Sequence, residues 1–184
     1  PEEFEKIIKK DKADGLNPFL VIASVGTTDT GAIDPLQALG EIANKNKLWY
    51  HIDAAYGGFF MLTPEGKKKL KGIELSDSLI IDPHKSLFLP YGTGIVIVKD
   101  RKQLQHSFNY SANYMQDSIH TDEELSPADL SPELSKHFRG LRMWLPLKLH
   151  GTKLFKVCLQ EKLLLAKYFY DEIQKAGFEV GPPP

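Results

Sequence analysis

The sequence predicts an α/β protein with a mainly parallel sheet, and three observations support this prediction. Short apolar runs rich in branched residues alternate with segments that carry apolar residues at helical spacing, as in strands joined by helical crossovers. Hydrophobic residues make up 42% of the 184 residues and charged residues 26%, which is the balance of a chain that buries a core. The formal net charge is -1, so neither nucleic acid nor a membrane is an expected partner.

The chain begins with a predicted helix and a predicted strand. Phe4, Ile7 and Ile8 are spaced for one face of an amphipathic helix, and Gly15 is positioned to end it. Residues 18–24 then form a short, continuous apolar run with branched side chains. This pattern is typical of a strand that is covered on both faces.

A second helix and a second strand are predicted next. Asp34 can cap the free backbone amides at a helix start, and Pro35 is tolerated in a first turn. The apolar strip of this helix would consist of Leu36, Leu39, Ile42 and Ala43. Residues 48–53 are the predicted second strand.

Two further strands follow a brief helix. Thr63 and Pro64 predict the start of this helix, which ends near Gly72, and the apolar runs 78–82 and 94–98 predict the third and fourth strands. Because no aromatic residues are interleaved with them, a group of lysines is interpreted as a solvated helix face and not as an anion site. These lysines are Lys67, Lys68, Lys69 and Lys71.

The C-terminal part changes in composition. Residues 117–133 contain six acidic residues and no Lys or Arg, and we expect a flexible loop over 107–136. Residues 141–149 and 152–176 predict helices. We interpret 141–184 as bridging helices and the beginning of a C-terminal small domain.

Cysteine use and chain ends suggest a cellular setting. Cys158 is the single cysteine, so no internal disulfide forms, and no paired Cys/His spacing predicts a metal site. We therefore expect a reducing, cytoplasmic environment. No apolar run has the length of a membrane span and no secretion signal is present. Because the chain lacks an initiator Met, we expect it to be a piece of a longer protein.

Polar residues follow three of the predicted strands. Thr28 comes after the first strand, Asp53 ends the second, and residues 82–85 follow the third. Parallel strands bring their carboxyl ends to one edge of a sheet, where open α/β sheets bind ligands. The small residues 54–58 would let a flat ligand approach the backbone closely.

Each of these residues also has a structural interpretation. Asp53 could cap a turn or pair with a nearby lysine. Lys85 could lie on the surface, although partial burial beside the apolar residues 87–89 would favour a neutral, nucleophilic amine. His84 could serve in packing or capping and not in catalysis.

Taken together, three residues fit the requirements of a pyridoxal-type cofactor. Such a cofactor needs a lysine to form an imine, an acid group to keep the pyridine nitrogen protonated, and a small side chain against one ring face. Lys85, Asp53 and Ala55 meet these needs. The protonated ring matters most, because it accepts the electron pair released when a bond at the substrate's α carbon breaks.

Four segments then carry a family resemblance: 26–28 (GTT), 51–58 (HIDAAYGG), 82–85 (DPHK) and 138–144 (FRGLRMW). They resemble the pyridoxal 5'-phosphate (PLP)-dependent group II decarboxylases, which include aromatic-amino-acid, glutamate and cysteine-sulfinate decarboxylases. The resemblance implies a fold-type-I PLP-dependent transferase architecture, in which residues 1–140 are the later half of the PLP-binding large domain.

The same resemblance implies roles for individual residues. Lys85 would form the imine with PLP, Asp53 would hold the pyridine nitrogen, and Ala55 would contact the ring. Thr28 and His84 would lie near the substrate carboxylate and the cofactor, with His84 joining Lys85 in catalysis.

Several positions need separate comment. Asp82, an expected cofactor-binding residue, stands where relatives carry an Asn that helps hold the phosphate, and its charge would repel phosphate unless a cation or a shared proton intervenes. Relatives in the aromatic branch have a loop Tyr that protonates the product carbanion, whereas residues 120–124 contain none and His120 is the candidate substitute. Asp34 matches a family Asp, but we prefer the helix-cap role. Arg139 would be a structural or active-site cation.

These features predict PLP-dependent decarboxylation of an L-amino acid through a Schiff base at Lys85, in a protein that forms a homodimer. The alternatives are another fold-type-I carbon–carbon lyase, an aldehyde-forming relative, and a catalytically inactive dimerisation module. Acidic, aromatic and sulfinate substrates stay open, because the pocket residues that distinguish them come from upstream segments and the second subunit. For the same reason we expect these 184 residues alone to bind cofactor weakly and to turn over little substrate.

Overall fold

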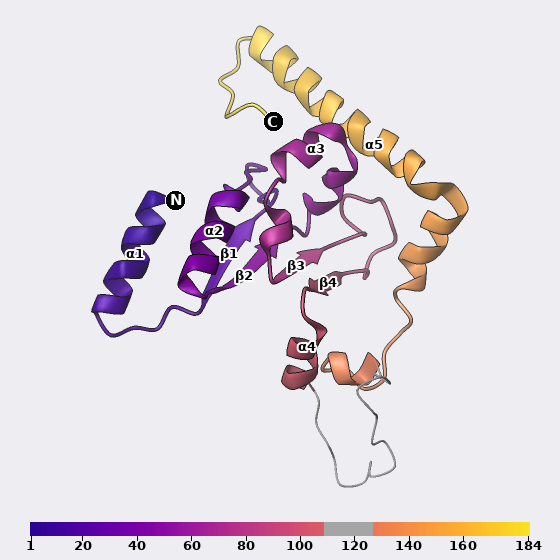
Figure 1. Cartoon of the computed structure of the whole chain (residues 1–184). Coiled ribbons are helices and arrows are strands. Elements are labelled where there is room, and N and C mark those ends of the chain that lie inside the picture. Colours follow the sequence, from indigo (N-terminus) through magenta and orange to yellow (C-terminus); the bar gives the residue numbers. More distant parts are fainter. Residues whose placement is uncertain (109–126) are drawn as a thin grey trace. The chain divides into compact units, whose positions relative to one another are not determined.

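The computed structural model describes residues 1–108 and 127–184 (Figure 1). The chain forms two compact units, Pro1–Ile97 with Arg139–Pro184, and Val98–Phe138. Among the described residues, no helix combines the length and the apolar character needed to cross a bilayer.

The first unit contains the sheet, and its strands lie in the order of the sequence. The strands are β1 (Leu20–Ser24), β2 (Trp49–Asp53), β3 (Ser78–Ile81) and β4 (Ile95–Val98). β1 pairs with β2, and β2 with β3, both in parallel. The prediction of an α/β protein with a mainly parallel sheet is therefore confirmed.

Helices α1 (Glu2–Ala13) and α2 (Leu36–Asn46) supply apolar side chains to one core with β1 and β2. From β1, Val21 and Ala23 enter this core. The expectation that β1 is covered on both faces is wrong for this structure, because Ile22 is 58% exposed. Successive side chains of a strand point to opposite faces, and only one face of β1 joins the α1–α2 core.

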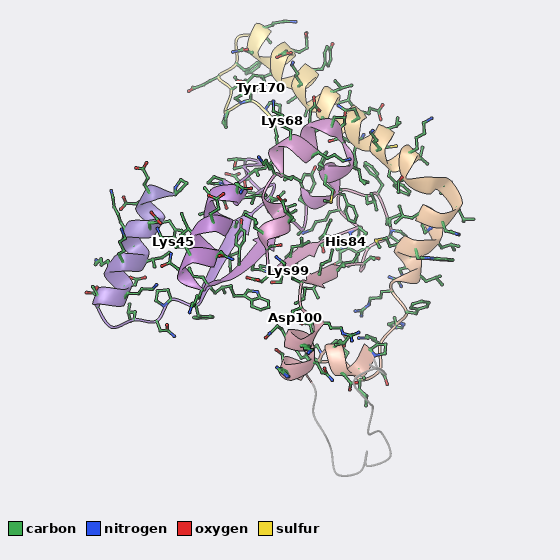
Figure 2. The ribbon with its side chains drawn as sticks, viewed as in Figure 1. Lys45, Lys68, His84, Lys99, Asp100 and Tyr170 are labelled. Atoms are coloured by element: carbon green, nitrogen blue, oxygen red, sulfur yellow. The ribbon has the colours of Figure 1, made fainter. Side chains whose placement is uncertain are left out.

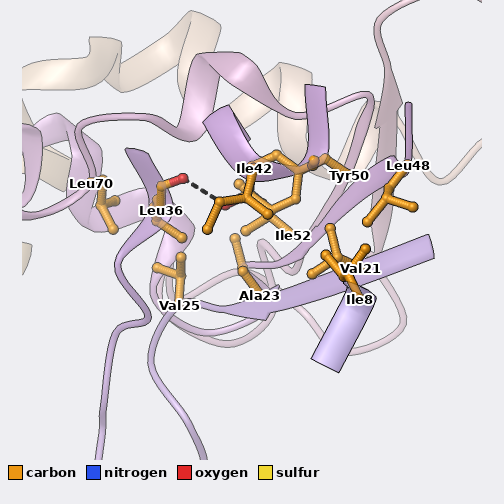
Figure 3. Close-up of a cluster of buried hydrophobic side chains, with 12 residues drawn as sticks. Ile8, Val21, Ala23, Val25, Leu36, Ile42, Leu48, Tyr50, Ile52 and Leu70 are labelled. Carbon is orange, nitrogen blue, oxygen red and sulfur yellow. Dashed lines mark hydrogen bonds between the residues drawn. The ribbon is translucent and has the colours of Figure 1, made fainter. Parts of the chain in front are cut away.

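Tyr50 of β2 lies in this core (Figure 3). Its side chain is 1% exposed, and its hydroxyl donates to the carbonyl oxygen of Leu36 at 3.0 Å. Leu36 is the first residue of α2, so this bond ties the start of the helix to β2. Burial, with a smaller effect from the Asp34 carboxylate, raises the pKa of Tyr50 to about 12.

Short helices follow β2. They are η1 (Gly58–Leu62), α3 (Pro64–Lys69) and η2 (Ile73–Leu75). The predicted start of α3 is confirmed, because the Thr63 hydroxyl accepts a hydrogen bond from the Gly66 backbone amide at 3.0 Å. The lysines on and after α3 are exposed, in agreement with a solvated face.

The C-terminal helix α5 (Leu141–Lys175) bends within its length. Gly151 interrupts it with non-helical angles (φ 68°, ψ 174°), and Pro146 lies inside its first part. Phe155 and Leu159 of α5 are buried with Leu87 in a second apolar cluster. Partly buried residues complete it: Phe59, Phe60, Leu62, Leu89, Met143 and Leu147. The predicted interruption is therefore confirmed.

The described part of the second unit contains α4 (Arg101–Phe108) and η4 (Pro127–Leu130). Within the segment 107–136, expected to be a flexible loop, residues 107–108 and 127–130 are thus helical. Residues 109–126, among them His120, lie outside the described residues.

Candidate active site

Backbone hydrogen bonds join the carboxyl ends of β1, β2 and β3 into one edge, called here the carboxyl edge. These bonds run from Val25 N to Asp53 O (2.7 Å), from Ala54 N to Ile80 O (3.1 Å) and from Asp82 N to Ala55 O (3.1 Å). Asp53 and residues 82–85 therefore follow neighbouring strands at the same edge, as the sequence predicted. This main-chain network fixes the spacing of the two segments.

Asp53 lies exposed at the end of β2. Its Oδ1 accepts a hydrogen bond from the backbone amide of Ala55 at 3.1 Å, so the turn-capping interpretation is correct for this oxygen. Among the described residues, no Lys or Arg pairs with Asp53, and its Oδ2 accepts no hydrogen bond. One carboxylate oxygen is thus available to an external cation or N–H group.

The sequence led us to expect Lys85 to be partly buried beside apolar residues, but its amine pairs with a carboxylate. Its side chain is 44% exposed, and its Nζ lies 3.0 Å from Oδ2 of Asp82, whose side chain is 19% exposed. The backbone amide of Lys85 also donates to the carbonyl of Asp82 at 3.0 Å. This tight turn brings the amine back over Asp82, and so directs it away from the apolar residues that follow.

His84 makes a contact that defines its hydrogen-bonding state. Its Nδ1 lies 2.7 Å from the carbonyl oxygen of Thr93, and only an N–H can donate to that acceptor. In the neutral ring, Nε2 is therefore an acceptor. The ring of His84, which is labelled in Figure 2, also makes a T-shaped contact with the ring of Tyr91. The ring centroids are 5.1 Å apart with 73° between the planes, consistent with the packing interpretation.

Sequence reasoning missed the residues that support His84. Besides Thr93 and Tyr91, Arg142 takes part, because its Nη1 donates to the carbonyl oxygen of Tyr91 at 3.1 Å. The signal in the sequence was the turn-forming segment 90–94 (PYGTG), in which Gly92 adopts a positive φ of 85°. A turn at this point returns the chain past the preceding histidine.

Thr28 lies exposed in a hairpin that follows β1. Thr27, its neighbour, closes the hairpin by accepting the backbone amide of Ala32 at 2.9 Å. The structure does not bring Thr28 into a hydrogen bond with Asp53 or Lys85, so its predicted role stays a prediction.

The glycines after Asp53 serve the packing of the protein itself. A Cβ on Gly57 would lie 2.5 Å from the carbonyl oxygen of Val25, and one on Gly58 would lie 2.7 Å from Cδ1 of Ile81. Both distances are shorter than the contacts that a Cβ atom makes with a non-bonded neighbour in proteins. Small residues are needed at these two positions because strand ends cross closely, and the access of a flat ligand to residues 54–58 stays a prediction.

Asp34 also differs from its expected role. The residue before α2 is Pro35, and no side chain caps this helix. Instead, Oδ2 of Asp34 accepts the backbone amide of Ser24 at 2.7 Å, and its own amide donates to the carbonyl of Ser24 at 3.0 Å. The helix-cap interpretation is therefore wrong, and Asp34 fastens the end of β1.

No group of three or more His, Cys, Asp and Glu residues suited to a metal is found within the described ranges.

Residues 1–180 match the family described as the pyridoxal-dependent decarboxylase conserved domain. The chain belongs to this decarboxylase family. Aromatic-L-amino-acid decarboxylase of Bacillus atrophaeus is 37% identical over 181 residues, which are 97% of this chain and 38% of that protein. Acidic amino acid decarboxylase GADL1 of Xenopus tropicalis is 35% identical over 184 residues, which are 98% and 36% of the two chains.

Solved structures of decarboxylases share the fold. Mouse CSAD in its apo form superposes with a TM-score of 0.90 at 32% identity, over 100% of this chain and 38% of that chain. Catharanthus roseus tryptophan decarboxylase in complex with L-tryptophan gives a TM-score of 0.84 at 31% identity, over 95% and 35% of the chains. This chain thus has the α/β fold of these enzymes and spans little more than a third of their length.

The donor groups at the carboxyl edge fit the pyridoxal cofactor of the family in kind. Lys85 offers a solvent-accessible amine, and Asp53 offers a carboxylate oxygen without a partner among the described residues. Ala55 is a small side chain joined to both segments through the backbone. The negative charge of Asp82, which would oppose a phosphate, is offset by the Lys85 ammonium.

Proposed function

We propose that the protein carrying this chain is a PLP-dependent carboxy-lyase that removes the α-carboxylate of an L-amino acid. The observation that carries the proposal is the presence of the Lys85 amine and the available Asp53 carboxylate on adjacent segments of one sheet edge. Similarity to decarboxylases of aromatic and acidic amino acids supports it.

In this proposal each residue has a defined task. Lys85 would hold the cofactor covalently, Asp53 would keep a proton on the pyridine nitrogen, and Ala55 would lie against the ring. Thr28 would bind polar groups of the substrate and the cofactor, and the acceptor nitrogen of His84 would accept a hydrogen bond from an N–H or O–H group there. Bound PLP supplies a ring that stabilises the electron pair left when carbon dioxide departs.

An aldehyde-forming reaction is the second candidate. Phenylacetaldehyde synthase of Arabidopsis thaliana is 32% identical over 100% of this chain, and Rhodiola rosea 4-hydroxyphenylacetaldehyde synthase superposes with a TM-score of 0.83. Product analysis separates the candidates, because a simple decarboxylase releases the amine and an aldehyde synthase releases the aldehyde.

Borohydride reduction of the PLP-loaded protein, followed by peptide mapping, tests the proposal. We expect a pyridoxyl group on Lys85 and on no other lysine, and loss of the modification in Lys85→Arg. Asp53→Asn should retain the modification and lose carbon dioxide release, because the nitrogen proton is no longer held. An unmodified Lys85 would contradict the enzyme assignment and favour a non-catalytic dimerisation module, and light scattering would show whether the protein is the expected homodimer.

A further inference from the structure

The candidate amine of this site already has a partner within the chain. Lys85 Nζ and Asp82 Oδ2 are 3.0 Å apart. Among the described residues, neither side chain forms another ion pair. The Asp82 carboxylate is therefore the charged group that determines where the amine rests.

Main-chain contacts hold Asp82 in place. Its backbone amide donates to Ala55 O at 3.1 Å, and its carbonyl accepts the amide of Lys85 at 3.0 Å. Gly94 lies against its side chain, since a Cβ there would be 3.1 Å from Oδ1. The carboxylate is thus more firmly positioned than the longer and more exposed lysine side chain.

We propose that Asp82 is a positioning residue whose carboxylate binds the Lys85 ammonium whenever the amine is not bonded to the cofactor. This inference rests on the proposed function, in which the substrate amine displaces Lys85 in each turnover. The displaced lysine then has a fixed location beside the site from which it returns. While it exists, the pair also neutralises a carboxylate that would otherwise repel an anionic ligand.

The charge of Asp82, and not only its hydrogen-bonding capacity, is essential to this role. Asp82→Asn keeps the shape and one acceptor oxygen but removes the charge. The ion pair holds the amine against Asp82, and the amine has to leave this partner before it can attack an electrophile. Amine-selective reagents should therefore react with Lys85 more slowly in the wild type than in this variant.

Labelling of the cofactor-free protein at one neutral pH and low salt measures this effect. Trinitrobenzenesulfonate is the probe, and mass spectrometry compares the Lys85 peptide with that of Lys68, an exposed lysine of α3 (Figure 2). We expect Asp82→Asn to raise the Lys85 rate about two- to fivefold, the range that a partly exposed ion pair allows. The Lys68 rate should stay constant, which would show that the reagent reacts equally with exposed lysines of both proteins.

Two controls make the outcome specific. Asp53→Asn removes the other carboxylate of the carboxyl edge, which does not pair with Lys85, and should leave the Lys85 rate unchanged. Salt at about 1 M screens exposed charges and should speed Lys85 labelling in the wild type but not in Asp82→Asn. The salt series on the wild type tests the proposal even when the variant fails to fold.

Equal Lys85 rates in the wild type and the folded variant, or a wild-type rate that salt does not change, would overturn the inference. Because labelling needs no cofactor, its result is independent of borohydride trapping. Trapped Lys85 with no effect of Asp82→Asn leaves the enzyme assignment standing and removes the role of Asp82. Faster labelling in Asp82→Asn without borohydride trapping of Lys85 would support the ion pair and contradict the enzyme assignment.

Discussion

A buried tyrosine makes the stability of this protein sensitive to alkaline pH. Tyr50 is almost fully buried, and burial raises its pKa from 10.0 to about 12. The folded state therefore keeps the phenolic proton at a pH at which the unfolded chain loses it. The corresponding stabilisation is complete below about pH 10 and is lost as the pH rises towards 12.

Tyr50→Phe tests this residue. The variant loses the hydrogen bond to the Leu36 carbonyl, and we expect its free energy of unfolding to be lower by about 1 kcal/mol at neutral pH. Above about pH 10 the wild type alone loses the tyrosine contribution, so the difference should shrink. Urea unfolding of both proteins at neutral pH and above about pH 10 measures this difference in the free energy of unfolding. An equal difference under the two conditions would contradict the raised pKa of Tyr50.

Contacts of single polar side chains were the hardest features to predict. Asp34 before Pro35 has the pattern of a helix cap, yet it binds the amide of Ser24, ten positions earlier. Lys85 has apolar neighbours in sequence but turns back to Asp82. The hydroxyl of Ser86 is buried without a hydrogen bond, and no sequence pattern predicted this burial. These outcomes depend on three-dimensional neighbours that spacing does not encode.

At the scale of elements, the segment between β1 and α2 is a closed hairpin. Val25 and Ile33 form an isolated antiparallel bridge, and Asp34 both donates to and accepts from the backbone of Ser24. The side chain of Asp34 therefore stabilises the base of the hairpin and not the first turn of α2.

Asp34→Ala separates these two roles. Loss of the 2.7 Å bond should speed hydrogen exchange at the Ser24 amide. The amide of Leu39, which donates to Pro35 O within the first turn of α2, should keep its wild-type exchange rate. Exchange monitored by NMR gives both rates. Faster exchange at Leu39 with no change at Ser24 would restore the helix-cap interpretation.

Helices and strands were predictable, because the apolar residues of each element recur at the spacing typical of its secondary structure. The apolar strip of α2 includes Leu36, Ile42 and Ala43, which are buried as expected. Covering of β1 was not predictable in the same way. A run of apolar residues indicates that burial is favourable, but it does not show which other elements cover the two faces of the strand. Ile22 remains exposed.

At the scale of the whole molecule, α5 is held to the sheet unit by few side chains. Phe155 and Leu159 are its buried residues, and they pack with Leu87. Most other apolar residues of α5 are exposed in this chain. The second cluster therefore carries the attachment of the helix.

Leu159→Ala should weaken that attachment. Removing a fully buried leucine leaves a cavity, and we expect the free energy of unfolding to fall by about 2–5 kcal/mol. Lys156→Ala, an exposed position on the same helix, should change it by less than about 0.5 kcal/mol. Denaturant unfolding of both variants measures the contrast. Equal effects would show that the cluster does not anchor α5.

The family and the fold were predictable from four short segments, 26–28, 51–58, 82–85 and 138–144. Their shared order along the chain is specific to one family, whereas a single short motif occurs in many folds. The roles of Thr28 and His84, and of residues 120–124, were not settled in that way. Thr28 makes no hydrogen bond with Lys85, and His84 is bound to a backbone carbonyl. Their roles stay predictions.

The hydrogen bonds between Asp82 N and Ala55 O, and between Ala54 N and Ile80 O, join main-chain atoms alone. Exchange of neighbouring side chains therefore leaves the interval between Asp53 and Lys85 unchanged. Mutation can therefore change the side chains around this edge while the acid and the amine keep their places.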